Sequence, residues 1–239
     1  TGNFLNLDFS DEQTLSNQLT GTGNINKTGT GTAVLNNAGS SVGNVTVNEG
    51  SLSFVQDGTF SAADYTTTAN GATALSEESK LELSGTYKQE SGGSLSLSLN
   101  PDDATAKIDA KDATIDGKLY ITNCDRTLSA KALMLHRDTV ITTQDGITGN
   151  FTDVEFGEPL LDIDYVVLDG STNINNYEVG YNLSWNTDTS KSHGDFTLAN
   201  SNDVFEVDVV LEDKSASSTT GWDGESLTKK GEGTLLLTE

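Results

Sequence analysis

The chain has 239 residues, 34% of them hydrophobic and 7% aromatic, which allows one large or two small domains with a core of modest side chains. Its 36 acidic and 13 basic residues give a formal net charge of −23, so the chain would repel nucleic-acid phosphates and an anionic membrane surface. Frequent Gly, Ser, Thr and Asn disfavour a helical protein. The single cysteine, Cys124, excludes an internal disulfide.

The first half of the chain repeats one motif, a glycine followed by alternating apolar residues. Gly31 opens GTAVL, Gly50 opens GSLSF, Gly71 opens GATAL, Gly93 opens GSLSLSL and Gly117 opens GKLYI, at steps of 19, 21, 22 and 24 residues. Alternation with a period of two places apolar side chains on one face, as a half-buried strand requires. The glycines follow Asn, Asp or Glu in several copies, which is typical of tight corners.

Further short strand patterns lie between these corners, for example NVTV at 44–47 and TYKQ at 86–89. The segment SKLEL at 79–83 is a stronger strand pattern than the motif at Gly71 and would break the even spacing. One coil of about 20 residues cannot bury a core alone, whereas stacked coils bury a continuous apolar column. The repeat therefore predicts an all-β parallel β-helix. We expect stacked polar ladders at corners, with three candidate residues: Asn36, Asn37 and Asn70.

The spacing becomes irregular from about residue 124. The segment at 140–156 still predicts strand, corner and strand, and LLDIDYVVLDG and YEVGYNLSW predict an antiparallel pair around STNINN. Two more strand patterns, SHGDFTL and DVFEVDVVL, precede the loop SASSTTGWDG. We expect one continuous stack in three parts: regular coils over 1–123, irregular coils with a hairpin and loop insertion over 124–226, and a resumed repeat over 227–239.

The pattern apolar-x-Lys-x-Gly-x-Gly-Thr occurs near both ends, as INKTGTGT at 25–32 and LTKKGEGT at 227–234. A phosphate-binding loop places such glycines between a strand and the N-terminus of a helix. Here an aliphatic strand pattern follows each copy, and Gly233 opens GTLLL. We therefore interpret Lys27-x-Gly29-x-Gly31 and its counterpart at Lys229 as structural corners.

The string Gly39-Ser40-Ser41-Val42-Gly43 matches G-x-S-x-G, the nucleophile elbow of some hydrolases. That elbow requires a following helix, but NVTV is strand-like. Only His136 and His193 could serve as the base of a triad. We expect a Ser/Gly corner, and we predict no catalytic residue.

Acidic and histidine residues offer weak candidates for metal binding. A zinc site needs three or four ligands, and the chain has no Cys/His cluster. It also lacks the Asp-rich loop of a common calcium site. The candidates that we set aside are His193-Gly194-Asp195, Asp162 with Asp164, Asp102-Asp103 and Asp208. We predict no metal ion and no cofactor.

Aromatic side chains gather in the irregular half of the chain. Such residues either fill a core or stack on a sugar or a protein partner, and we favour the core. They are Tyr165, Tyr177, Tyr181, Trp185 and Trp222.

The two Lys-x-Gly-x-Gly strings resemble the passenger-associated repeat of autotransporters, L-x-K-x-G-x-G-T-L-x-L, although Ala33 stands where Leu is usual. The stretch from GITGNFTDVEF through YNLSW, HGDFTL and DVFEVDVVL to GWDGESLTKKGEGTLLL is similar to the passenger region of AIDA-type autotransporters of Gram-negative bacteria. The similarity rests on motifs over part of the chain and on composition over the rest.

This resemblance implies a right-handed, single-stranded β-helix that belongs to a longer passenger, exported through an outer-membrane barrel that the fragment lacks and displayed on the cell surface. It also implies a role in adhesion, cell aggregation and biofilm formation, and in some members glycosylation of Ser or Thr. We expect a non-enzymatic adhesin that binds copies of itself or a host surface or matrix component, without nucleic acid and without inserting into a membrane.

Two alternatives remain open. One is a polysaccharide-degrading β-helix, which needs clustered acids with arginine or lysine to handle a sugar acid. The chain has only two arginines, Arg126 and Arg137, which disfavours this activity. The other is a purely structural stalk whose C-terminal half promotes folding.

Overall fold

The computed structural model describes residues 3–100 and 105–239, and these residues are nearly all β. The chain forms two compact units. The first comprises Thr1–Thr122, Asp138–Glu155 and Gly170–Glu178, and the second comprises Asn123–Arg137, Phe156–Asp169 and Val179–Glu239. No helix among the described residues is both long and apolar enough to cross a membrane. The expectation of one continuous stack over the whole chain stays a prediction.

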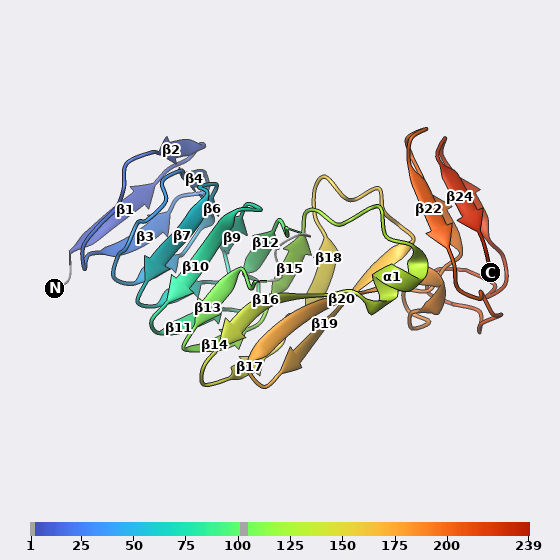
Figure 1. Cartoon of the computed structure of the whole chain (residues 1–239). Helices are drawn as coiled ribbons and strands as arrows, with labels where there is room; N and C mark the ends of the chain where they lie inside the picture. The colour runs from blue at the N-terminus through green and yellow to red at the C-terminus, as the bar shows by residue number, and fades with distance from the viewer. Residues whose placement is uncertain (1–2, 101–104) are drawn as a thin grey trace. The chain divides into compact units, whose positions relative to one another are not determined.

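Three sheets build the first unit (Figure 1). One sheet has the order β1 (Phe4–Asp8), β3 (Asn24–Thr28), β5 (Val45–Val47), β8 (Tyr65–Thr67), β11 (Thr86–Gln89), β14 (Asp112–Ile115) and β17 (Ile147–Gly149). The second has the order β18 (Asp153–Phe156), β15 (Lys118–Ile121), β12 (Ser94–Leu97), β9 (Gly71–Leu75), β6 (Gly50–Phe54), β4 (Thr32–Leu35) and β2 (Gln13–Leu15). The third has the order β19 (Val166–Asn173), β20 (Asn176–Leu183), β16 (Arg137–Thr143), β13 (Ile108–Ala110), β10 (Ser79–Leu83) and β7 (Gly58–Ala62).

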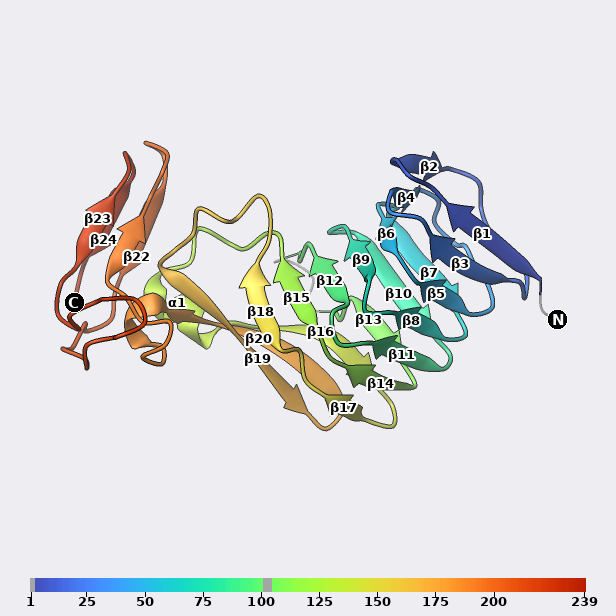
Figure 2. The ribbon, with the colours of Figure 1, turned by 180° about the vertical axis from the view of Figure 1, so that it is seen from behind.

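Successive strands go to successive sheets. After β5, β6 and β7, the chain returns to the first sheet, where β8 pairs with β5 in parallel and Val45 lies opposite Tyr65. From β5 to β16, each turn of the chain therefore adds one strand to each sheet, whereas the turns β1–β2 and β3–β4 add strands to the first two sheets; Figures 1 and 2 show the stacked strands. This winding is compatible with a solenoid.

The strands opened by glycine in the sequence repeat, β4, β6, β9, β12 and β15, are consecutive neighbours in one sheet. Gly50 of β6 lies directly opposite Gly71 of β9. One repeat is thus one turn of the chain, which confirms the sequence prediction. The strong pattern SKLEL is β10, the third strand of its turn, and it does not interrupt the repeat.

The core of the first unit consists of columns of side chains that the parallel register stacks. Leu52, Leu95 and Leu119 form one column together with Thr73, and all are buried. Buried aromatic rings also belong to this core, with edge-to-face packing of Phe54 on Phe60 at 4.9 Å and stacking of Tyr65 on Tyr87 at 6.0 Å. Burial raises the pKa of both tyrosines, and the hydroxyls of Tyr65 and Thr73 are hydrogen-bonded at 2.9 Å.

Lys27, from the first Lys-x-Gly-x-Gly string, is completely buried. Its Nζ donates to the carbonyl oxygens of Thr28 at 2.7 Å, Gly29 at 2.7 Å and, one turn further along the chain, Glu49 at 3.1 Å. Burial lowers the pKa of Lys27, and the nearby charges of Asp8 and Glu49 oppose that shift. The lysine therefore satisfies carbonyl groups at the corner that its own motif forms.

A second buried side chain, Gln89, donates hydrogen bonds to corner carbonyl groups in the same way. Gln89 stands in the column that contains Lys27, Val47 and Thr67. Its Nε2 donates to three carbonyl oxygens, those of Gly93 at 3.1 Å, Asp116 at 2.8 Å and Lys118 at 3.0 Å. Lys27 and Gln89 thus occupy the same column, and each donates hydrogen bonds to several carbonyl groups of the corners.

The second Lys-x-Gly-x-Gly string repeats part of this geometry in the other unit, because Lys229 Nζ donates to the Gly231 carbonyl at 2.6 Å. Strand β4 follows the first string, and strand β24 (Thr234–Leu237) follows the second. No helix begins at either glycine pair, so the prediction of structural corners is confirmed and the phosphate-loop reading is excluded.

Asparagine ladders form, but at other positions than those expected. Asn26 donates to the Asn6 side chain at 3.3 Å, and Asn48 donates to Asn26. Asn37 instead donates to the Ser16 carbonyl at 2.7 Å. Asn37 therefore contacts the neighbouring turn through a backbone carbonyl and not through another side chain, while the expectation for Asn36 and Asn70 stays a prediction. Which asparagines align depends on the register of the neighbouring turn.

Strands β19 and β20 are neighbours in their sheet and are joined by only two residues, 174–175, which is the arrangement of a β-hairpin. The turn is therefore shorter than the predicted STNINN. The turn belongs to the first unit, and its carbonyl groups accept hydrogen bonds there: that of Ile174 from Ile147 N at 3.0 Å and that of Asn175 from Thr143 N at 2.7 Å. The hairpin tip extends the hydrogen bonding of the stack.

The second unit contains two small parallel sheets. Strand β21 (Asp195–Thr197) pairs with β23 (Thr228–Lys230), and β22 (Val204–Val207) pairs with β24. Its core is aromatic, with the ring of Tyr165 4.5 Å from Phe205 and 5.8 Å from Phe196. The segment 227–239 thus contains two strands, β23 and β24, on either side of the glycine corner, as the resumed repeat predicts.

One helix was not expected from the composition, namely α1 (Ala130–Leu135) in the second unit. Ser129 caps its N-terminus by accepting from Ala132 N, and the Asp208 carboxylate accepts from Lys131 N at 2.8 Å. Ala130 and Leu133 are buried. The local run AKALML has high helix propensity, and the cap and burial together outweigh the β-rich context.

Replacing Lys27 by methionine should test how much its hydrogen bonds to the corner carbonyl groups stabilise the protein. The substitution keeps most of the volume but removes the donors to Thr28, Gly29 and Glu49, so buried carbonyl groups lose their partner. We expect the free energy of unfolding to fall by about 2–3 kcal/mol. Urea denaturation followed by circular dichroism measures this change.

Lys88 provides the matched control because it lies on β11, next to Gln89, but is exposed and forms a surface ion pair with Glu90 at 2.7 Å. Lys88→Met should cost less than about 1 kcal/mol. Equal losses of unfolding free energy in the Lys27 and Lys88 variants would contradict the stabilising role of the corner hydrogen bonds of Lys27.

Candidate functional site

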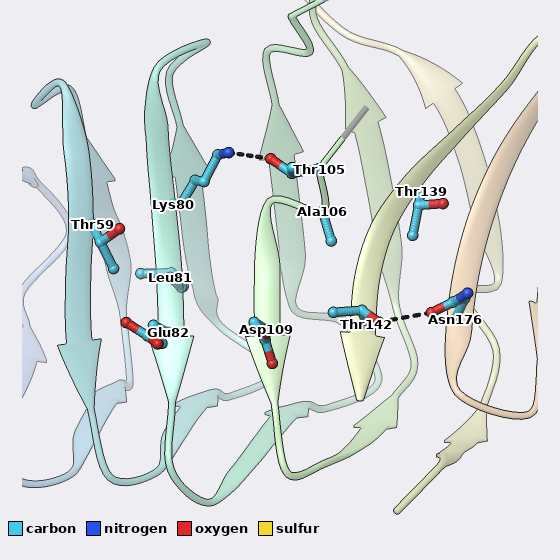
Figure 3. A pocket seen from close by; sticks show the side chains of 10 residues that line it. All are labelled: Thr59, Lys80, Leu81, Glu82, Thr105, Ala106, Asp109, Thr139, Thr142 and Asn176. Carbon is cyan, nitrogen blue, oxygen red and sulfur yellow. Dashed lines mark hydrogen bonds between the residues drawn. The ribbon is translucent and has the colours of Figure 1, made fainter. Parts of the chain in front are cut away.

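A groove of about 520 Å³ lies on the outer face of the third sheet of the first unit (Figure 3). Polar and apolar atoms contribute almost equally to its surface. The lining residues are Thr59, Lys80, Leu81, Glu82, Thr105, Ala106, Asp109, Thr139, Thr142 and Asn176.

The alternation of each strand aims the polar side chains at this groove. In β10 the residues Ser79, Leu81 and Leu83 are buried, so Glu82 is exposed on the opposite face. Asp109 is likewise the exposed residue between two buried residues of β13.

The parallel register then brings residues that are distant in the sequence into one row. Ser61 lies opposite Glu82, Glu82 opposite Asp109, and Asp109 opposite Thr142. Neighbouring members of such a row are about 4.8 Å apart. The groove therefore has an outward row of hydrogen-bonding groups along its length.

Two hydrogen bonds flank the groove in Figure 3. Lys80 Nζ donates to Thr105 Oγ1 at one side, and Thr142 Oγ1 donates to Asn176 Oδ1 at 2.7 Å at the other. Within the described residues, no ion pair engages Glu82 or Asp109. Two carboxylates in direct register repel each other, so the groove favours a partner that supplies positive charge or hydrogen-bond donors.

Sequence reasoning did not single out Glu82 or Asp109. Their strand patterns, SKLEL and the short IDA, show that each residue faces outward, which was a usable signal. Their pairing across 27 residues follows from the register alone. The arginines considered for sugar-acid chemistry lie in the second unit, where Arg126 binds Asp162 at 3.0 Å and Arg137 Nη1 donates to the His136 carbonyl at 2.6 Å.

The G-x-S-x-G string forms a corner, as predicted. Ser40 is buried, and its Oγ accepts from Leu19 N at 3.0 Å. Ser41 makes isolated bridges to Thr20 and Ser61. The next element is the strand β5 and not a helix, so the local geometry of a nucleophile elbow is not formed.

The acidic candidates of the sequence serve local structure in the second unit. Asp162 pairs with Arg126, Asp208 holds the start of α1, and the Asp164 carboxylate accepts from Thr197 N at 2.8 Å. Asp102-Asp103 lies outside the described residues. Across 3–100 and 105–239, no group of three or more His, Cys, Asp and Glu residues is arranged to hold a metal ion.

The string His193-Gly194-Asp195 is a local hydrogen-bonded turn. His193 Nδ1 accepts from Asp195 N at 3.2 Å, and the Asp195 carboxylate pairs with Lys230 at 2.8 Å. These residues border a separate pocket of the second unit together with Trp222.

The aromatic residues of the irregular half are buried in separate packing groups. Trp185 packs edge-to-face on Trp222 at 4.7 Å, Tyr181 lies 5.7 Å from His136, and Tyr177 packs on Phe151 in the first unit. Tyr165 belongs to the phenylalanine cluster, where burial raises its pKa to about 12. All five aromatic residues are buried, which confirms the prediction that they fill a core, and Trp222 also lines a pocket.

No family model matches the chain, and no match to a curated protein sequence is found.

Asp223 should make the second unit sensitive to acid. Its carboxylate accepts from Ser226 Oγ, from Glu225 N at 3.0 Å and from Ser226 N at 2.8 Å, and these bonds lower its pKa from 3.8 to about 2. The unfolded carboxyl group binds protons first as the pH falls, so this contribution is present above the ordinary pKa and is lost on descent through about 2.

We therefore expect the Asp223→Asn variant to lose less thermal stability than the parent between about pH 4 and pH 2. Thermal unfolding followed by circular dichroism at several pH values measures the difference. Glu225→Gln removes one charge from the same turn and serves as the control. An unchanged acid profile in Asp223→Asn would contradict the assignment.

Proposed function

We propose that this chain is part of the passenger of an AIDA-type autotransporter and acts as a non-enzymatic adhesin on the surface of a Gram-negative bacterium. The observation that carries the proposal is the in-register stacking of parallel strands, which turns the outer faces into long rows of polar side chains. The two passenger-type repeats at Lys27 and Lys229 support the class of protein.

We further propose that the stack is a right-handed, single-stranded parallel β-helix. The return of β8 to β5 after one strand in each of the other sheets supports this architecture. Right-handed crossover is the strongly preferred connection between parallel strands of one sheet. The hairpin of β19 and β20 is then an excursion from the regular winding.

Adhesion fits the chemistry of the outer faces. In the sheet of β6, β9 and β12, the outward row places three small residues, Ser53, Ala74 and Ser96, between Val34 of β4 and Tyr120 of β15. In the sheet of β5 and β8, Thr46 lies opposite Thr66. Small polar side chains let a second surface approach closely, and many weak contacts in a row add up when two long surfaces align.

The negative net charge of the chain limits which molecules can bind to it. A surface with 36 acidic and 13 basic residues repels nucleic acid and anionic lipid, and it opposes contact between two copies at low salt. Self-association between neighbouring cells therefore needs aligned hydrogen bonds and local ion pairs, with salt reducing the general repulsion. A host surface or matrix component that supplies cations or hydrogen-bond donors is the other class of partner.

Displaying the full passenger on non-aggregating cells tests the adhesive function. We expect sedimenting aggregates or adherence to host cells, and a reduction of about tenfold when the groove carries Glu82→Arg with Asp109→Arg, because the change reverses its charge. Ser96→Arg on β12, which lies in another sheet, is the matched control for the added positive charge. Deletion of residues 1–239 without any loss of aggregation and adherence would overturn the proposal.

A second candidate function is cleavage of a polysaccharide in the groove. The observation that favours it is the presence of Lys80, Glu82 and Asp109 along one groove, because acid–base chemistry on sugars uses carboxylates with a nearby cation. Release of products from neutral and acidic glycans, abolished in Glu82→Gln, would establish this activity. No release by the parent protein from any of these glycans would remove it.

A further inference from the structure

The second unit contains a separate pocket of about 270 Å³. It lies between the turn at 193–195 and the loop that leads into β23. It is lined by His193, Gly194, Asp195, Thr220, Gly221, Trp222, Asp223, Ser226 and Thr228.

The indole of Trp222 gives this pocket a rigid apolar wall. Its Nε1 donates to the Ser226 carbonyl at 2.7 Å, and its ring packs edge-to-face on Trp185 at 4.7 Å. Gly194 makes the close packing possible, because a Cβ atom there would overlap the Ser226 carbonyl oxygen and lie 2.8 Å from Trp222 Nε1. The ring therefore cannot swing away without disturbing both neighbours.

The polar groups of the pocket include both donors and acceptors. His193 Nδ1 accepts from Asp195 N, so the neutral imidazole carries its proton on Nε2, and no described residue accepts from that atom. The Asp195 carboxylate accepts from Lys230 Nζ through Oδ2 and keeps Oδ1 available. The Thr220 hydroxyl is fixed by its bond to the Ser192 carbonyl at 2.6 Å.

We propose that this pocket binds one residue of a neutral sugar. The C–H face of a pyranose ring packs on Trp222, while one hydroxyl group accepts from His193 Nε2 and donates to Asp195 Oδ1. A hydroxyl group is both donor and acceptor, and this pairing of an imidazole donor with a carboxylate acceptor uses both properties. The rigid wall and the fixed turn limit the ordering that binding requires.

The charges of the pocket select among sugars and against other ligands. Asp195 and Asp223 supply two carboxylates, and Lys230 is the cation that pairs with one of them. A uronic acid or a phosphate group would meet this negative charge and be repelled. A metal ion is disfavoured as well, because the acidic and histidine residues of the described chain do not form a set of metal ligands.

Intrinsic fluorescence of the whole chain provides a direct test. Trp185 and Trp222 are the two tryptophans of the sequence; Trp222 lines this pocket and packs on Trp185. Glucose, galactose and N-acetylglucosamine are added separately, with glucosamine and glucuronate as charged comparisons. We expect a saturable change with at least one neutral sugar at a Kd on the order of 1 mM, and no saturation with glucuronate.

His193→Asn should weaken this binding by about tenfold, because the amide oxygen still accepts from Asp195 N while the Nε2 donor is lost. Asp195→Asn should weaken it too, through loss of the carboxylate acceptor. Glu225→Gln, outside the pocket lining, is the matched control and should bind as the parent does. Near-ultraviolet circular dichroism verifies that each variant keeps its tryptophan packing.

Three outcomes would overturn the proposal: no saturable change with any neutral sugar, unchanged affinity in both pocket variants, or binding of glucosamine alone that salt abolishes, which would indicate a cation site. Oligosaccharides of the sugar that binds distinguish a glycan chain from a free monosaccharide as the natural source. The aggregation assay uses groove variants of the first unit, so failure of the sugar site leaves the adhesive function untouched.

Discussion

Parallel hydrogen bonding between strands one turn apart is the constraint on which the first unit depends. Gly50 to Phe54 pair residue by residue with Gly71 to Leu75, and each further turn repeats this relation. Because the register is parallel, inward residues stack on inward residues and outward residues on outward ones. A single turn has too few large side chains for a core, so each turn is stable only when its neighbours cover it.

The same register also stacks polar groups, and their surroundings differ between the inward and the outward faces of the sheets. Inside, Lys27 and Gln89 each donate to several corner carbonyls, so the buried ammonium group of Lys27 and the buried amide group of Gln89 are both hydrogen-bonded. Outside, Glu82 and Asp109 face solvent in adjacent strands, where no such compensation is required. The pairing that builds the core therefore also places two carboxylates side by side in the groove.

The second unit uses parallel pairing in shorter sheets and relies more on aromatic packing. Phe196 and Phe205 pack against Tyr165, and Trp185 supports Trp222. The loops between its strands are held by hydrogen-bonded turns, for example at Asp223. Hydrogen-bonded loops around the Trp222 indole border a pocket of about 270 Å³, which is smaller than the groove of about 520 Å³ in the first unit.

The sequence by itself determined the strands and corners, because alternation and glycine act locally: GSLSF, GATAL and TYKQ are strands as predicted, and both Lys-x-Gly-x-Gly strings are corners. The surface-adhesin function rests on resemblance and stays a proposal. Tertiary structure alone decided the asparagine ladder, the pairing of Glu82 with Asp109 and the meeting of His193 with Trp222. Each of these depends on which residues of distant segments lie opposite one another, and a register set by long-range pairing leaves no local mark in the sequence.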